Sequence, residues 1–227
     1  MRENYGILRA VSIDVYIGYG RCGVSGSDPG DTELRKGKWV LTHHEWYDKQ
    51  ERDCDIAMIR LTNVFDHPRK FIYSNETPKR GREEEIYVVG YPSDIPLDHQ
   101  HHMSEDSKGK VMYQSSKKIT WDLDNPNIGL TYRADTYAGN SGGPVLRYNG
   151  ATLEVIGVHT CGNKSSGLNS ATKLGHYGNH LPTFLDALNK LQGNIQGTAL
   201  PNGRFCNDKV EGWPQGQILT LPYVRPQ

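Results

Sequence analysis

Short runs of alternating apolar and polar residues, separated by turn residues, recur along most of this chain. In the run 12–20, the alternation places Ile13, Val15 and Ile17 on one face of an extended segment, as in a half-buried β-strand. Further runs of this kind lie at 37–42, 55–61, 85–92, 109–114, 117–123, 127–133, 143–149 and 153–160. Many short strands at such intervals are typical of β-sandwiches and β-barrels. The sequence therefore predicts an all-β fold.

One amphipathic helix is predicted toward the end of the chain. Its apolar positions keep the period of an α-helix and are Leu181, Phe184, Leu185, Leu188 and Leu191. Pro182 in the first turn and Gly193 just past the end fit the usual places of these residues at helix termini. Residues 194–227 are rich in Pro and Gly and show little periodicity. We interpret them as an extended tail, part of which docks on the domain.

The length and charge of the chain limit the classes of protein to which it belongs. Its 227 residues suffice for one sizeable domain or for two small halves that share an interface. Lys+Arg and Asp+Glu number 26 each, so no broad electrostatic field favours nucleic acid or an anionic membrane. No apolar run is long enough for a transmembrane helix, and the N-terminal segment lacks the apolar core of a secretory signal. We expect a monomer without nucleic-acid or membrane partners, which as written stays in the cytosol.

The cysteines give no metal signature. They are Cys22, Cys54, Cys161 and Cys206, and none of them belongs to a CxxC pair, which argues against a zinc site. A disulfide between Cys22 and Cys54 is one alternative if the parent protein is secreted, and free buried thiols are the other. The sequence also has no recognisable calcium-ligand spacing. No metal or other cofactor is therefore expected.

The stretch TYAGNSGGPV, residues 136–145, gives the clearest indication of a catalytic site. Its glycines at 139, 142 and 143 permit a tight turn with positive φ angles and a close approach of a ligand. In such a turn the amides of Gly139 and Ser141 converge beside the serine hydroxyl as an oxyanion hole. A glycine-rich hairpin with an unreactive serine is the alternative. The stretch favours Ser141 as a nucleophile.

Asp55 is the candidate for a carboxylate that orients a catalytic base. In DCDIAMIRL, residues 53–61, it directly precedes an apolar strand. A carboxylate in this place lies at the edge of a core, where it can hold an imidazole. An aspartate that only caps a turn has the same sequence context. Asp53 is the weaker candidate, because it lies further from the strand.

Together these segments resemble chymotrypsin-like serine proteases, and among them the glutamyl endopeptidase branch of bacteria and fungi. The resemblance covers about residues 11–192 and rests on HHEWYDKQERDCDIAMIRL (43–61), VVGYPSDIP (88–96), DTYAGNSGGPV (135–145), VIGVHTCG (155–162) and the terminal helix. It implies a double antiparallel β-barrel, the first barrel incomplete, with a C-terminal helix. The expected units are 1–80 for the partial first barrel, 81–193 for the second barrel with the helix, and 194–227 for the tail.

The resemblance also implies roles for particular residues. Asp55 corresponds to the acid of the catalytic triad and Ser141 to its nucleophile, and the family's chain order of His, Asp and Ser agrees with this pair. The amides of Gly139 and Ser141 correspond to the oxyanion donors. The parent family is secreted, so secretion is implied for the parent protein.

A substrate pocket for acidic side chains is implied by two further residues. In the glutamyl branch a histidine follows the strand after the nucleophile, and a threonine precedes the serine by five positions; here these are His159 and Thr136. An imidazole and a hydroxyl can together bind a carboxylate. A core histidine satisfied by the backbone is the alternative for His159. Asp135 stands at the offset of a trypsin-like pocket for basic side chains, but Thr136 and the GVHT strand favour cleavage after Glu or Asp.

No histidine stands where this family carries its catalytic base. The family places it several tens of residues before the aspartate, whereas residues 1–42 contain no histidine. His43 and His44 lie close before Asp55 and match a histidine that lies on a surface loop in many relatives. The run HQHH, 99–102, is interpreted as a solvated loop, with metal binding as a minor alternative.

These observations predict a serine-type endopeptidase that acts on peptides or proteins through an acyl-enzyme. The chain as given lacks the triad histidine, and the resemblance implies that its first strands are missing as well. A non-catalytic module of protease fold that binds peptides or proteins is the main alternative. A slow protease, in which a neighbouring histidine replaces the base, is a third.

Overall fold

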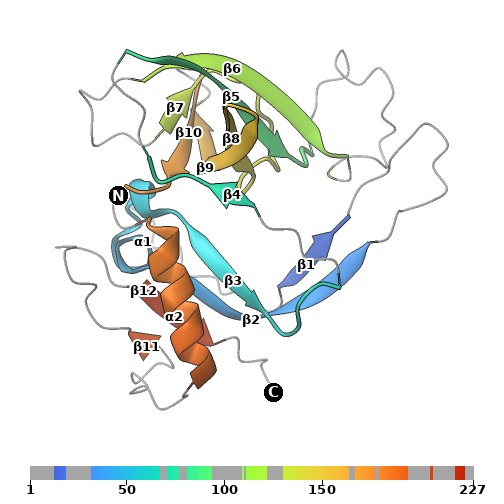
Figure 1. Ribbon diagram of the computed structural model, residues 1–227, viewed down its shortest axis with the longest axis vertical. Coiled ribbons are helices and arrows are strands. Elements are labelled where there is room, and N and C mark those ends of the chain that lie inside the picture. The colour runs from blue at the N-terminus through green and yellow to red at the C-terminus, as the bar shows by residue number, and fades with distance from the viewer. Residues whose placement is uncertain are drawn as a thin grey trace, which may run out of the picture.

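Two curled β-sheets and two α-helices make up the described part of the chain in the computed structural model (Figure 1). The described residues are 13–18, 32–66, 71–76, 81–93, 109, 111–121, 130–163, 167–176, 179–193, 205–206 and 218–222. Within them, one sheet has five strands and the other has seven. In Figure 1 the larger sheet lies above the smaller one, and β4 (Ile72–Tyr73) lies between them.

The smaller sheet is built around the long strand β2 (Glu33–His43). Its N-terminal part pairs with β1 (Asp14–Ile17), and the rest pairs with β3 (Ala57–Leu61). The C-terminal half of β2 also pairs with β12 (Ile218–Pro222), beyond which lies β11 (Phe205–Cys206). Because β3 is hydrogen-bonded to one edge of β2, the C-terminal strand β12 pairs with the other edge. Part of the tail thus satisfies backbone groups that an open sheet edge would expose.

The smaller sheet is a half-barrel, because no described strand pairs with the outer edge of β3. Ile59 on β3 is 39% exposed, and Val64 and Phe71 beyond it are 80% and 77% exposed. A closed barrel would bury such side chains in its interior. The predicted incomplete first barrel is confirmed.

The larger sheet has the strand order β6-β5-β8-β9-β10-β7, and all these neighbours are antiparallel. The short strand β4 pairs with β9 in the parallel direction. The strands are β5 (Glu83–Gly90), β6 (Tyr113–Thr120), β7 (Leu130–Tyr132), β8 (Pro144–Asn149), β9 (Thr152–Asn163) and β10 (Leu168–Lys173). Alternate side chains of these strands fill a core that includes Ile86, Val88, Val145 and Ile156.

A second core joins the two sheets to the C-terminal helix α2 (Leu181–Gly193). Phe184 and Ala187 of α2 pack with Leu41 of β2, with Ile56, and with Leu174 at the end of β10. Burial of a phenylalanine and leucines of this kind contributes about 2 kcal/mol per side chain. The core therefore holds the half-barrel, the larger sheet and α2 in one arrangement.

Between β2 and β3 the chain forms α1 (His44–Lys49) and a short 3₁₀ helix, Arg52–Cys54. His43 caps the N-terminus of α1, and Gln50 ends it in the left-handed conformation with φ of 56°. This compact connection places Asp55 just before β3. There its carbonyl accepts a hydrogen bond from Thr172 of β10.

The predicted fold class is confirmed, although individual elements differ from the predicted runs. The predicted runs 109–114 and 117–123 both overlap one strand, β6, which spans Tyr113–Thr120. The strand β10 has the sequence LNSATK, which lacks apolar alternation although its last three residues are buried. Neither it nor the short helix α1 was predicted. The helix α2 has the predicted extent, except that Gly193 is its last residue.

Two cysteines in the described part of the chain form no disulfide. Cys54 is buried and forms no disulfide, so the disulfide between Cys22 and Cys54 is not formed. Burial raises the pKa of Cys54 to about 12, and the charge of Asp53 adds to the shift. Cys161 forms no disulfide either. Cys22 lies outside the described residues. Neither described helix is long and apolar enough to cross a membrane.

Candidate active site

The residues around Ser141 form a tight loop between β7 and β8. Gly139 and Gly142 have φ angles of 97° and 86°, in the region that glycine adopts at little cost. At Gly143 a side chain is excluded, because a Cβ atom there would lie 2.1 Å from the carbonyl oxygen of Val89. The glycines of the motif are therefore required by the backbone of this loop.

Hydrogen bonds tie this loop to β9. The amide of Gly142 donates to the carbonyl of His159 over 2.7 Å, and the amide of His159 donates to the carbonyl of Gly143 over 2.8 Å. The exposed Ser141 donates its hydroxyl to the carbonyl of Thr160 over 2.9 Å. The hydroxyl proton of Ser141 is thus directed at a backbone carbonyl and not at an imidazole.

Ser93, just after β5, fixes the orientation of a peptide group in the same loop. The carbonyl of Ala138 accepts the Ser93 amide over 2.7 Å and the Ser93 hydroxyl over 3.1 Å. The C=O and N–H of a trans peptide point in opposite directions, so the amide of Gly139 points away from Ser93. In the described part of the chain, neither this amide nor that of Ser141 donates to a protein acceptor. Two oriented amides without acceptors suit a developing oxyanion.

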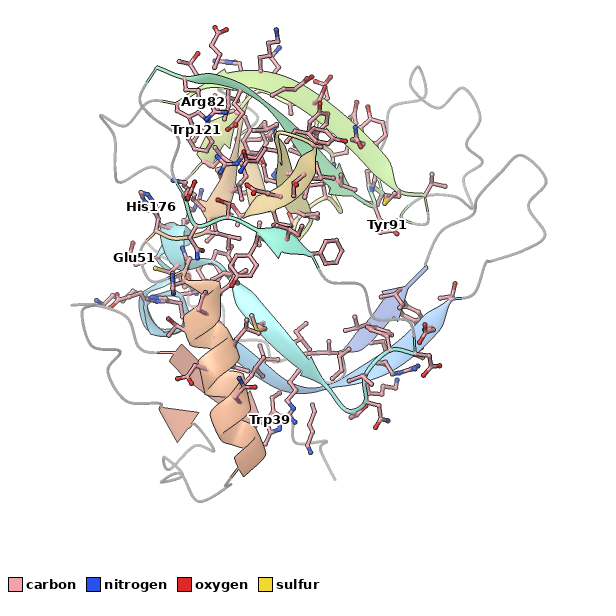
Figure 2. All side chains as sticks on the ribbon, viewed as in Figure 1. Trp39, Glu51, Arg82, Tyr91, Trp121 and His176 are labelled. Carbon is pink, nitrogen blue, oxygen red and sulfur yellow. The ribbon has the colours of Figure 1, made fainter. Side chains whose placement is uncertain are left out.

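Sequence reasoning missed Ser93 as part of this loop. The signal was present, because Ser93 belongs to the stretch VVGYPSDIP, which follows β5. The neighbouring Tyr91, labelled in Figure 2, also contacts the loop: a Cβ atom on Gly139 would lie 2.6 Å from its carbonyl oxygen. The end of β5 therefore shapes the loop that carries Ser141.

Asp55 follows the 3₁₀ helix and lies half-buried at the start of β3. Its carbonyl accepts the hydroxyl of Thr172 over 2.9 Å. Burial raises the pKa of the Asp55 carboxyl, and the Arg52 guanidinium opposes this shift. No hydrogen bond reaches the Asp55 carboxylate from the described residues. A half-buried carboxylate of this kind is suited to hold a cationic partner.

The neighbouring strands β9 and β10 bring Asp55 and Ser141 to one region. Thr172 of β10, which binds the carbonyl of Asp55, pairs with Val158 of β9. Ser141 binds the carbonyl of Thr160, two residues along from Val158. The candidate nucleophile and the candidate acid thus contact the same short stretch of two adjacent strands, although no hydrogen bond joins them directly among the described residues.

Arg52 is a further residue of this region that the sequence did not single out. Its carbonyl accepts the hydroxyl of Thr172 over 3.3 Å. Its exposed guanidinium reaches the thiol of Cys161, with Nη1 at 3.7 Å from Sγ. Cys161 directly follows Thr160, to which Ser141 is bonded. The cation of Arg52 therefore lies near Asp55 and near the stretch of β9 to which Ser141 is bonded.

His159 is buried next to the nucleophile loop. Its Nδ1 lies 2.6 Å from the hydroxyl of Tyr132 on β7. Burial lowers the pKa of His159, and a backbone hydrogen bond with Ser170 opposes the shift. Thr136 lies in the segment between β7 and Ser141 and is half-buried, and its hydroxyl makes no hydrogen bond with described residues.

The structure also describes the two aspartates that were weaker candidates for the site, Asp135 for a pocket and Asp53 for the triad acid. Asp135, the candidate for a trypsin-like pocket, is exposed. Asp53 lies within the 3₁₀ helix, and its carbonyl accepts the side-chain amide of Asn179. Within the described residues, no three histidine, cysteine or acidic side chains are grouped so as to hold a metal ion.

A sequence model of one protein family, Trypsin, matches residues 14–180. The chain belongs to the trypsin family. Among solved structures, that of a Glu endopeptidase in complex with MPD aligns with 81% of this chain and 73% of its own, with a TM-score of 0.56 and 20% sequence identity. At this identity the similarity shows the fold alone, which is that of the chymotrypsin-like serine proteases.

A second solved structure, protease Anisep from Arthrobacter nicotinovorans, aligns with 62% of each chain at a TM-score of 0.39 and 16% identity. A search of curated proteins finds no match. The family match and the fold of the Glu endopeptidase structure together confirm the resemblance to chymotrypsin-like proteases at the level of family and fold.

In this trypsin-family chain, no described histidine side chain is hydrogen-bonded to Ser141 or to Asp55. His43 lies at the end of β2, is 1% exposed, and accepts the amide of Glu45 at Nδ1 over 3.1 Å. The expectation that His43 lies on a surface loop is therefore wrong, because it is the buried N-cap of α1. The side chains of His44 and of the run 99–102 lie outside the described residues.

Proposed function

We propose that this chain carries the nucleophile, the oxyanion donors and the specificity pocket of a serine endopeptidase that cleaves after Glu or Asp. The observation that carries the proposal is the loop between β7 and β8. In it the exposed Ser141 lies beside two amides that have no acceptor among the described residues. Membership of the trypsin family supports the same reaction class.

In the proposed reaction, Oγ of Ser141 attacks the carbonyl carbon of the scissile peptide while its proton passes to a base. The resulting oxyanion accepts hydrogen bonds from the amides of Gly139 and Ser141. The base then returns the proton to the leaving amine, and water hydrolyses the acyl-enzyme by the same route in reverse. Asp55 orients the base and stabilises its cationic form.

The base is the part of this mechanism that no described residue supplies. The hydroxyl of Ser141 donates to Thr160, and the Asp55 carboxylate has no hydrogen bond from the described residues. Without an imidazole the serine hydroxyl stays protonated near neutral pH. Loss of a triad member of this kind costs about 10⁶-fold in turnover. We therefore propose that the chain as given hydrolyses peptides very slowly unless a base is added.

The acidic preference is assigned to His159 and Thr136. The nucleophile loop is hydrogen-bonded to the backbone of His159 on both sides, so a substrate acylating Ser141 lies close to this residue. Thr136 lies five residues before Ser141 in the same loop segment and has an uncommitted hydroxyl among the described residues. Hydrogen bonds from these groups to a carboxylate are worth about 1.5–3 kcal/mol each.

A second candidate function is favoured by the hydroxyl of Ser141. Its hydrogen bond to a backbone carbonyl is what a serine in a binding site, not a reacting one, would make. On this hypothesis the chain is a module of protease fold that binds acidic peptides without cleaving them. The exposed guanidinium of Arg52 next to Cys161 adds a cation suited to such ligands.

The pocket assignment is tested by peptide binding, which requires no catalysis. We expect a short peptide ending in Glu to bind this chain about tenfold or more tightly than the same peptide ending in Gln, since one charge-assisted hydrogen bond is at stake. The His159→Ala variant is expected to lose most of this preference and to keep only the part that the Thr136 hydroxyl supplies. Calorimetry or chemical-shift titration measures the dissociation constants.

The control for this experiment is His180→Ala, which removes a histidine at the entry to α2, where it lies beside Thr183. It is expected to leave the preference for Glu unchanged. Equal binding of the Glu and Gln peptides by the unmodified chain would refute the acidic pocket. Tighter binding of a peptide ending in Lys would instead assign the pocket to Asp135.

A further inference from the structure

The last residues of β9 have one free edge among the described residues. On one side, residues 161–163 pair with residues 168–170 of β10. On the other side, the pairing of β8 with β9 extends only to Val158. Beyond that point β9 contacts the nucleophile loop, where Ser141 donates its hydroxyl to the carbonyl of Thr160. No described strand pairs with residues 160–163 on this side, so an extended peptide can add to this edge.

Thr160 and Gly162 present their backbone groups to this free edge. The carbonyl of Thr160 accepts the Ser141 hydroxyl from that side, and alternate residues of a strand present their backbone groups to the same edge. Cys161, which lies between them, faces β10 instead, where its carbonyl accepts the hydroxyl of Ser170 over 3.3 Å. An antiparallel peptide bonded to Thr160 and Gly162 therefore has one residue directly opposite Cys161.

Arg52 reaches the same stretch of β9 from the 3₁₀ helix. Its backbone carbonyl accepts the hydroxyl of Thr172 on β10 over 3.3 Å, so the helix is tied to that strand. Its guanidinium is exposed, and Nη1 lies 3.7 Å from Sγ of Cys161. Among the described residues this guanidinium forms no ion pair, although its sequence neighbours are Glu51 and Asp53. A thiol is a weak acceptor, so the cation keeps N–H groups for a stronger one.

We propose that Arg52 binds an acidic side chain at the position directly before the residue that acylates Ser141. This inference rests on the proposed function, which places the acylating residue beside Thr160. The residues that precede it run toward Asn163, because β8 and the nucleophile loop occupy the other direction. The residue directly before it then lies opposite Cys161.

The pleat of the strands makes this assignment specific for one position. Residues directly opposite each other in an antiparallel pair have side chains on the same face, with Cβ atoms about 4.5–5.5 Å apart. A carboxylate opposite Cys161 therefore lies beside the guanidinium of Arg52, which contacts the Cys161 thiol. The side chain one position earlier in the peptide points to the other face, away from Arg52.

The test is the binding of short peptides to the full chain, measured by calorimetry. A peptide ending in Glu-Glu is expected to bind about threefold more tightly than one ending in Gln-Glu, the range of an exposed ion pair. Arg52→Gln is expected to remove this difference, and Arg52→Glu to favour a peptide ending in Lys-Glu. High salt is expected to weaken the preference, because it screens exposed charges.

Two controls separate a contact from a general effect of charge. Lys49→Gln removes the same charge from the neighbouring helix α1, where the side chain of Lys49 is 60% exposed, and is expected to keep the threefold preference. In the second control, a Glu is moved to the third position from the end of the peptide, where Arg52→Gln is expected to have no effect.

Equal binding of the Glu-Glu and Gln-Glu peptides by the unmodified chain would overturn the proposal. An equal loss in Lys49→Gln, or an equal effect of Arg52→Gln at the third position, would overturn it as well. The terminal residue is compared separately, with peptides that share the residue before it. If the chain binds terminal Glu and Gln equally but keeps the preference that depends on Arg52, the proposed acidic pocket fails while the role of Arg52 stands.

Discussion

Adding imidazole to this chain is expected to raise the rate at which a fluorophosphonate modifies Ser141 by about 10²-fold, the lower end of what a general base contributes. The reason lies in the surroundings of the hydroxyl, which donates to the carbonyl of Thr160 and meets no described imidazole. The amides of Gly139 and Ser141 have no acceptor among the described residues and can bind the oxyanion. The component that the described residues do not supply is the base. Intact-mass analysis over time measures the modified fraction.

The control for this labelling experiment is Ser141→Ala, which is expected to remain unmodified at every imidazole concentration. Asp55→Asn is expected to reduce the acceleration, because a carboxylate orients the imidazole and stabilises its cation. Rapid labelling without imidazole would show that a histidine of the chain itself serves as the base. Labelling that is slow in all conditions would favour the peptide-binding module.

Replacing Arg147 with methionine is expected to lower the free energy of unfolding by about 3–5 kcal/mol, the cost of leaving buried charges unpaired. Arg147 lies on β8 with its side chain 5% exposed. Its guanidinium contacts Glu154 at 3.4 Å, Glu84 at 3.5 Å and the hydroxyl of Ser74 at 3.0 Å. Glu84 also accepts the indole N–H of Trp121 over 2.9 Å (Trp121 is labelled in Figure 2).

Urea unfolding measures this loss, and Arg82→Met is the matched control. Arg82 also contacts Glu84, at 3.4 Å, but its side chain is 57% exposed. Exposed pairs contribute at most about 1 kcal/mol, so this control is expected to unfold almost as the unmodified chain does. Adding Glu154→Gln to Arg147→Met is expected to recover part of the loss. Equal effects of Arg147→Met and Arg82→Met would contradict a structural role for the buried pair.

The strands were predictable from the sequence where apolar residues alternate. The runs that became β5, β8 and β9 alternate clearly, because one face of each strand fills the core of the larger sheet. The strand β10 was not predictable, since its buried Thr172 and Lys173 are polar residues satisfied by tertiary contacts. The tail strand β12 was not predicted, and its pairing with β2 depends on the rest of the fold.

The candidate site was predictable where the backbone dictates the residue. The glycines around Ser141 are such positions, since positive φ angles and close backbone contacts demand them. Ser93 and Tyr132 act only through contacts with residues distant in the sequence, Ala138 and His159. No local pattern reveals such partners, so the sequence alone did not single them out.

The most direct measurement of the central claim is a map of cleavage sites. An unfolded protein substrate is incubated with the chain and imidazole, and the new termini are identified by mass spectrometry. The account predicts slow cleavage after Glu and Asp that depends on imidazole and is absent from Ser141→Ala. Cleavage after Lys or Arg, cleavage that persists in Ser141→Ala, or no cleavage at any imidazole concentration would contradict it.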